Sequence, residues 1–130
     1  MSKLSKMNTL ANKLADQDFK YGKLDCYIFT AKLVKEWHGK DFSHLHAVYK
    51  SQNAAEHYIE ANGGIDALTT GTLGYPLRST SLAEDGDVVT ADVNGDVVLG
   101  FVFKGSGLFK MKKSLVKVPL KKCQTAWQVK

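Results

Sequence analysis

The chain has few of the residues that identify several large classes of protein. Its 130 residues include only 2 cysteines, Cys26 and Cys123, which are too few for a disulfide framework and lack the C-x-x-C spacing of a zinc site. No apolar run approaches the ~18 residues that a membrane span needs, and the amino terminus lacks the apolar stretch of a signal peptide. We therefore expect reduced cysteines, no membrane span and a protein that is made in a cytoplasm.

Arginine is also scarce, and the basic charge is concentrated at one end of the chain. The formal net charge is +5, yet residues 1–103 carry 10 basic and 13 acidic side chains, whereas residues 104–130 carry 8 lysines and no acid. Surfaces that read phosphates usually combine arginine with stacking aromatics, and Arg78 is the only arginine here. The sequence therefore disfavours nucleic acid as a partner and predicts strands with lysine on their exposed faces, a docking edge for an acidic protein.

Helical patterns fill the first part of the chain. Apolar residues at spacings of three and four predict a first helix that ends near Asp18. A second helix follows, with Asp25 as its N-cap and Gly39 as its stop. A third helix is predicted over about 51–61, and one further short helical piece precedes a Gly and Pro loop at 74–76.

The pattern then changes to that of strands. Two β-branched runs at 87–92 and 97–103 flank Asn94-Gly95, a pair suited to the positive φ angles of a tight hairpin, and shorter strands are predicted at 108–111, 115–118 and 126–129. With 44% apolar residues, the chain can bury one core. We predict a single α+β domain over 1–130, with a helical part at about 1–73 packed on an antiparallel sheet at about 86–130.

Cys26 is the residue with the clearest chemical potential. In the first turn of a helix a cysteine meets the positive end of the helix dipole and unpaired N–H groups, which favour the thiolate. The adjacent carboxylate of Asp25 opposes this activation. Cys26 is thus either a candidate nucleophile or a small apolar residue on a buried face.

A thiolate nucleophile normally needs an imidazole to accept its proton. His38 and His57 lie on predicted helices beside polar neighbours, and solvated surface positions are favoured for both. His44 and His46 alternate in a loop and could face one site, as a base or as a metal pair, although two histidines are a weak metal signal. No cofactor and no metal are predicted.

The order of several short motifs resembles the NlpC-type branch of the papain-like fold. An aromatic-Gly-x-x-Asp-Cys turn at 21–26 opens a helix, a Gly-Asp-Val-Val strand follows at 86–89, and a hydrophobic-Gly-hydrophobic strand follows at 99–101. The chain more closely resembles a family of small phage proteins of that fold, found among tail-tip and tail-assembly genes, with Gly63-Gly64 after the third helix and an Ala-Trp strand at 126–129. The resemblance covers about residues 10–129.

The resemblance implies roles for individual residues. Cys26 matches the nucleophile of those cell-wall peptidases and amidases, and Asp25 matches the acid that precedes it. The catalytic histidine should stand at Val98, and no polar residue that could orient an imidazole follows, since Lys110 or Lys112 would be a poor substitute. Losing the base typically costs ~10²–10⁴-fold or more in rate.

Two main readings follow. In the first, the chain is a structural component of a phage tail, in the tail tip or in tail assembly. It would be made in the host cytoplasm and built into the virion beside other tail proteins, with a homo-oligomeric ring as one arrangement, and Cys26 would be vestigial. In the second, it is an active cysteine hydrolase that cleaves peptides of host peptidoglycan, with Cys26 as nucleophile and His44 or His46 as a substitute base. A third hypothesis, which the sequence favours less than the other two, is a nucleic-acid-associated module that uses the C-terminal lysines.

Overall fold

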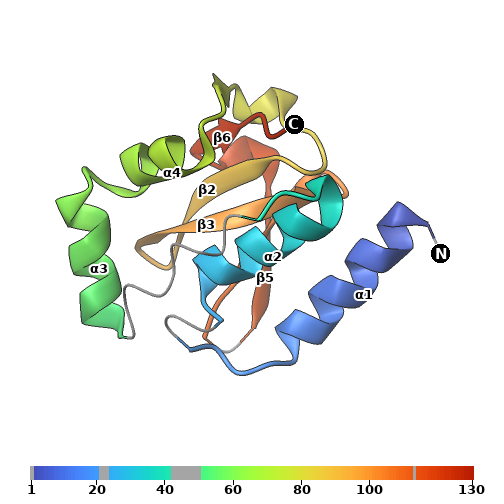
Figure 1. Cartoon of the computed structure of the whole chain (residues 1–130), viewed down its shortest axis with the longest axis horizontal. Coiled ribbons are helices and arrows are strands. Elements are labelled where there is room, and N and C mark those ends of the chain that lie inside the picture. The colour runs from blue at the N-terminus through green and yellow to red at the C-terminus, as the bar shows by residue number, and fades with distance from the viewer. Residues whose placement is uncertain (1, 21–23, 42–50, 113) are drawn as a thin grey trace.

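The structure is a computed structural model that describes residues 2–20, 24–41, 51–112 and 114–130. Within these residues, four α-helices are followed by a sheet of six strands, the α+β arrangement that the sequence predicts (Figure 1). The helices are α1 (Lys3–Ala15), α2 (Cys26–His38), α3 (Gln52–Ala61) and α4 (Ile65–Leu73). The strands are β1 (Leu77–Arg78), β2 (Val88–Val93), β3 (Asp96–Phe103), β4 (Ser106–Lys110), β5 (Leu115–Pro119) and β6 (Thr125–Trp127).

Helix α1 is shorter than the sequence predicts. It ends at Ala15 with Asp16 as C-cap, rather than near Asp18, because its apolar stripe has no inward-facing residue after Leu14. Leu4 is 48% exposed although it belongs to the apolar spacing of this helix, because the first turn extends beyond the sheet that the rest of the helix covers.

Helix α2 has the boundaries and caps that its sequence predicts. The Asp25 carboxylate accepts a hydrogen bond from the backbone N–H of Ile28 at 2.9 Å, so it satisfies one of the free donors of the first turn. At the other end Gly39 adopts a left-handed conformation with φ of 76° and closes the helix onto the carbonyl of Lys35. Cys26 is therefore fixed as the first residue of the helix.

The sheet is antiparallel throughout, in the order β1-β6-β2-β3-β4-β5. Asn94 and Gly95 connect β2 and β3 with φ angles of 55° and 91°, which confirms the predicted tight hairpin. The sheet begins before residue 86, because the short strand β1 pairs with β6. This pairing was not predicted, since a strand of two residues has no measurable periodicity.

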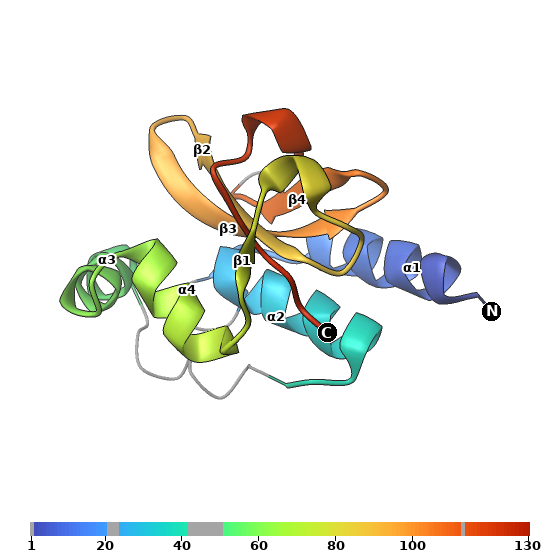
Figure 2. The same cartoon turned by 90° about the horizontal axis from the view of Figure 1, so that it is seen from above.

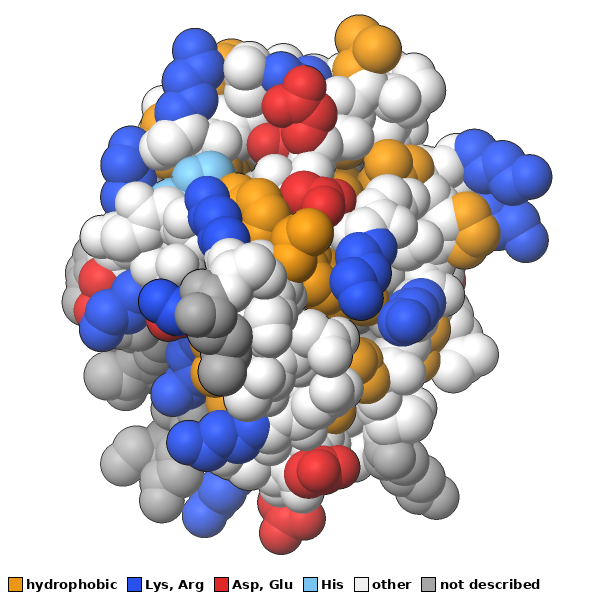
Figure 3. Space-filling view, turned by 90° about the vertical axis from the view of Figure 1, so that its right-hand side faces the viewer, with side chains coloured by type: hydrophobic (Ala, Val, Ile, Leu, Met, Phe, Trp, Pro, Cys, Tyr) orange, Lys and Arg blue, Asp and Glu red, His pale blue; other side chains and the backbone are white. Residues whose placement is uncertain are grey.

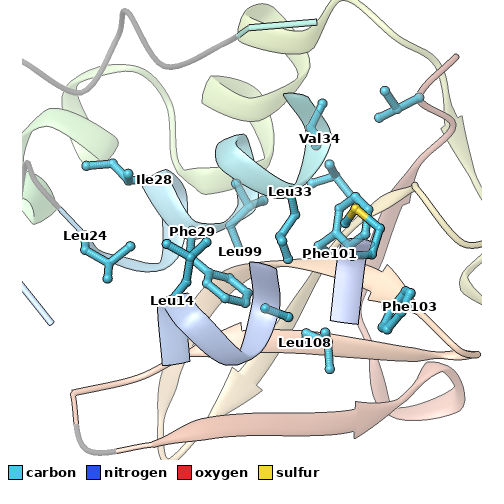
Figure 4. Packing of buried hydrophobic residues seen from close by; sticks show 14 of the residues in the cluster. Leu14, Leu24, Ile28, Phe29, Leu33, Val34, Leu99, Phe101, Phe103 and Leu108 are labelled. Carbon is cyan, nitrogen blue, oxygen red and sulfur yellow. The ribbon is translucent and has the colours of Figure 1, made fainter. Parts of the chain in front are cut away.

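The two faces of the sheet bury different sets of side chains. On the helical face, α1 and α2 pack against alternate residues of the central strands: Phe29 and Leu33 of α2 meet Leu99, Phe101 and Leu108 of the sheet (Figure 4). The other face forms a second cluster around Val89, Val102 and Phe109, joined by side chains from the 3₁₀ turns η2 (Thr80–Leu82) and η3 (Leu120–Lys122) and their flanks. Seen from above, the helices lie on one side of the sheet and the 3₁₀ turns on the other (Figure 2).

One of the C-terminal lysines corrects the prediction that they all lie on exposed faces. Lys110 is only 2% exposed, and its ammonium donates hydrogen bonds to the carbonyls of Ala15 at 2.9 Å and Gln17 at 2.7 Å. The reason is the strand's alternation, which turns Lys110 toward the helical face, where carbonyls at the end of α1 favour a cation. The other described lysines of this region are exposed: Lys104, Lys112, Lys117, Lys121, Lys122 and Lys130.

Candidate functional site

Cys26 lies where two strands of the sheet separate. Strands β3 and β4 pair only as far as Phe101 and Leu108, although β3 reaches back to Asp96. Between Asp96 and Phe101, β3 therefore has no partner strand on this side among the described residues. The backbone groups of Leu99 point to this side, so they have no partner in the β-ladder. The backbone of Leu99 instead forms a hydrogen bond with Cys26, which places the thiol against β3.

The environment of this thiol suppresses its ionisation. Burial is the largest effect and raises the pKa of Cys26 to about 11 from an ordinary value of 9.0. The hydrogen bond from the Leu99 backbone acts in the opposite direction, and the negative charge of Asp25 raises the pKa further. The residue keeps a partly exposed surface, but desolvation outweighs the favourable N–H groups at the start of α2. Cys26 is therefore a neutral thiol at neutral pH.

A cleft of about 430 Å³ opens beside Cys26. Its wall includes Val98, the position at which the resemblance expects a histidine. Polar side chains come from α3, which contributes Gln52 and Glu56, and from the end of β4, which contributes Lys110. With Asp96 and Lys112 also in its lining, the cleft combines a thiol, two carboxylates and two ammonium groups, and no histidine is among the described residues that line it.

Neither of the two described histidines lines the cleft beside the thiol. His38 is the last residue of α2, and at ~1.5 Å per residue along a helix it stands roughly 18 Å from Cys26. One of its ring nitrogens, Nε2, is 2.8 Å from the carbonyl oxygen of Gly86, so His38 is partly buried and bonded rather than fully solvated. His57 is exposed on α3, as expected. The substitute bases His44 and His46 fall outside the described residues.

Lys110 and Lys112, the two residues considered as substitutes for the group that orients the imidazole, have structural partners. Lys110 binds carbonyls at the end of α1, and the ammonium of Lys112 donates to the Oε1 atom of Gln52 at 3.0 Å. An ammonium has no acceptor with which it could orient a neutral imidazole. The two side chains instead connect β4 and the turn after it to the end of α1 and to α3.

A second polar cluster, which the sequence does not reveal, surrounds Asp87. This carboxylate is 3% exposed and accepts hydrogen bonds from the backbone N–H groups of Glu84 at 3.0 Å and Val129 at 3.2 Å and from the Arg78 guanidinium at 3.3 Å. Burial raises the pKa of Asp87, while the Glu84 N–H and the Arg78 charge oppose that rise. The cluster holds the last strand and the segment before β2 together, so its role is structural.

The described residues include no group of three or more His, Cys, Asp or Glu side chains that could hold a metal ion. Nor does any helix in the described ranges combine the length and the apolar character needed to cross a bilayer. Both cysteines are free, and Cys123 is buried with its sulfur 3.6 Å from the carbonyl oxygen of Pro119.

Comparison with known proteins gives one match. A family model described as a domain of unknown function (DUF6950) covers residues 3–129, so the chain belongs to that family. No curated protein and no solved structure matches the chain.

Proposed function

We propose that this member of the DUF6950 family is a non-catalytic structural component of a phage tail, built on an NlpC-type papain-like fold. In this proposal the domain contributes a surface to tail assembly, and its cysteine is a remnant of an ancestral active site. The phage assignment comes from the order of motifs in the sequence, and the loss of catalysis comes from the environment of Cys26.

The arrangement of Cys26 supports the papain-like part of the proposal. In that fold a cysteine at the start of a helix faces a strand of an antiparallel sheet. Here Cys26 begins α2 and is bonded to the backbone of Leu99 on β3, directly after Val98. Val98 lines the same cleft as Cys26, and its side chain also packs against the second apolar cluster, on the face of the sheet away from α2.

A single observation supports the loss of catalysis most strongly. The thiol that matches the nucleophile has a pKa of about 11, and Val98 stands where its base would be. A thiol with that pKa is a thiolate in only about one molecule in 10⁴ at pH 7. Without an imidazole the thiol also has no group to protonate the leaving amine.

The test is assembly of virions that carry Cys26→Ala, with Cys123→Ala as the matched control for removal of a free cysteine. The proposal expects both variants to give tails in wild-type numbers with wild-type infectivity. Loss of infectivity in Cys26→Ala alone, with normal folding of the purified variant, would contradict it. Normal particles that lack the protein altogether would exclude an assembly role.

The alternative is an active hydrolase of peptidoglycan peptides, and the cleft beside Cys26 favours it. It requires His44 or His46, which lie outside the described residues, to supply the base. Purified protein would then release peptides from cell walls, and iodoacetamide or Cys26→Ala would abolish the release. Release that survives Cys26→Ala would exclude this mechanism.

A further inference from the structure

One edge of the sheet is an open strand with basic side chains. Strand β5 is last in the sheet order and pairs with β4 on one side only. Across the described ranges of the chain, no strand pairs with its outer edge. Lysine and acidic side chains both border an apolar patch on the face of the molecule that Figure 3 presents, which includes the side that carries α1.

The register of β5 determines which backbone groups point outward. The Met111 N–H donates to the Ser114 carbonyl at 2.9 Å, so these two residues form a hydrogen-bonded antiparallel pair. Such pairs alternate with pairs whose N–H and C=O groups point away from each other. In the register of β4 and β5, Leu115 and Lys117 belong to the second kind. Their backbone groups therefore point away from β4, toward the open edge.

The side chains along this edge present two different faces. Lys117 is exposed and lies opposite Leu108, on the helical side of the sheet. Val116 and Val118 point to the other side, where they pack against the second apolar cluster. A strand added at this edge would therefore meet a cation on one face and valines on the other.

Three exposed lysines lie on or directly after β5. Lys121 and Lys122 follow β5 in η3 and are exposed, and no acidic residue occurs in 104–130. Lys117, Lys121 and Lys122 form no ion pair with any of the residues that the structure describes. The edge thus attracts an acidic partner.

The same charge disfavours a second copy of the chain. Antiparallel pairing of two β5 strands about a twofold axis near Lys117 would bring the two Lys117 side chains together, and like charges opposite each other destabilise a sheet. Lysine and proline on an edge strand are known devices against such pairing, and Pro119 ends β5 without an outward N–H group. Lys117 and Pro119 disfavour pairing with a second β5 strand, but they leave the edge available to a strand that carries negative charge.

We propose that the outer edge of β5 binds an extended segment of a neighbouring protein in which acidic and apolar residues alternate. The segment adds a seventh strand, its backbone bonds to Leu115 and Lys117, and its acids face Lys117 while its apolar side chains extend the valine face. The identity of the neighbouring protein rests on the proposed role in tail assembly. Binding of the segment to the β5 edge is a property of the isolated chain.

The test uses a labelled peptide of alternating Glu and Val, with a Lys and Val peptide of the same length as the charge control. Fluorescence anisotropy measures affinity at low and moderate salt, and amide NMR reports which residues are contacted. We expect the acidic peptide to bind at least about tenfold more tightly than the basic one, because complementary charge and avoided repulsion act together. The amides of Leu115 and Lys117 should gain protection from exchange.

Three variants separate charge from backbone pairing. Lys117→Gln removes the charge and should weaken binding severalfold. Lys117→Pro also removes the outward N–H, leaves the bonds to β4 intact because that N–H does not face β4, and should abolish binding. Lys32→Glu changes an exposed lysine on α2 and should leave affinity unchanged within about twofold.

Several outcomes would overturn the proposal. Equal binding by Lys117→Gln and Lys117→Pro would exclude backbone pairing, and equal binding of both peptides would exclude the charge match. A concentration-dependent dimer that blocks the peptide would assign the edge to a second copy. Failure of the tail role would be seen separately in the virion experiment, because a chain that binds the acidic peptide but leaves virions unaffected retains this site and loses only the tail assignment.

Discussion

Replacement of Gly86 by alanine tests how α2 is fastened to the sheet. Gly86 lies before β2 with a φ of 97°, and its carbonyl oxygen accepts a hydrogen bond from His38. A methyl group added here would stand 2.4 Å from the Nε1 atom of Trp37 and 2.9 Å from the Nε2 atom of His38. Both residues belong to the last turn of α2, so the substitution pushes the end of this helix away from the sheet.

The expected cost combines two effects. An alanine at positive φ costs about 1–2 kcal/mol in backbone strain. Trp37 has little freedom to move, because its ring makes edge contacts with Phe101 and Phe103 at centroid distances of 6.3 and 6.5 Å. Overpacking of this kind costs about 1–3 kcal/mol. Gly86→Ala should therefore reduce the free energy of unfolding by about 2–5 kcal/mol.

A matched control isolates the second effect. Gly95 has a similar φ of 91°, and nothing lies within 4 Å of the position of its added methyl group. Gly95→Ala should cost only the strain, about 1–2 kcal/mol. Urea denaturation followed by tryptophan fluorescence measures both variants. Equal losses in the two variants would refute the close contact between Gly86 and the end of α2.

Three further predictions concern the polar groups near the cleft. Because the folded state holds the Cys26 proton to about pH 11 and the unfolded chain releases it near its ordinary value of 9.0, this thiol contributes stability below pH 9 that is lost as pH rises through 11. Wild type should lose about 2 kcal/mol relative to Cys26→Ala between pH 8 and 11 in urea titrations, and a constant difference would contradict the raised pKa. Lys110→Met should cost about 1–3 kcal/mol in the same assay, since it removes two bonds to carbonyls at the end of α1, and unchanged stability would argue against them. Asp25→Asn keeps an N-cap but removes the neighbouring charge, so the pKa of Cys26 should fall in a thiolate absorbance titration, whereas Asp25→Ala should cost about 0.5–2 kcal/mol of stability.

The parts of the fold that depend on local chemistry were predictable from the sequence. The Asp25 cap and the Gly39 stop determine α2 through groups within one turn of each residue. The Asn94-Gly95 pair determines the β2–β3 hairpin because few residues tolerate positive φ. These features need no information from distant parts of the chain.

The remainder depends on contacts between distant residues. Lys110 reaches carbonyls 93 and 95 positions away, and His38 reaches Gly86 across 48 positions, so neither local charge nor local polarity indicates their burial. The raised pKa of Cys26 also cannot be predicted from its neighbours in the sequence. The helix N-terminus is visible in the sequence, but the desolvation that dominates the pKa of Cys26 results from its burial in the folded chain.

The most direct test of the central claim is the pH dependence of Cys26 alkylation. In a Cys123→Ala background, Cys26 is the single cysteine, and its reaction with iodoacetamide reports the thiolate in the native protein. A non-catalytic thiol should react slowly at neutral pH, with a rate that rises toward a midpoint of about pH 11. Rapid reaction with a midpoint below the ordinary value of 9.0 would identify Cys26 as an activated nucleophile and contradict the account.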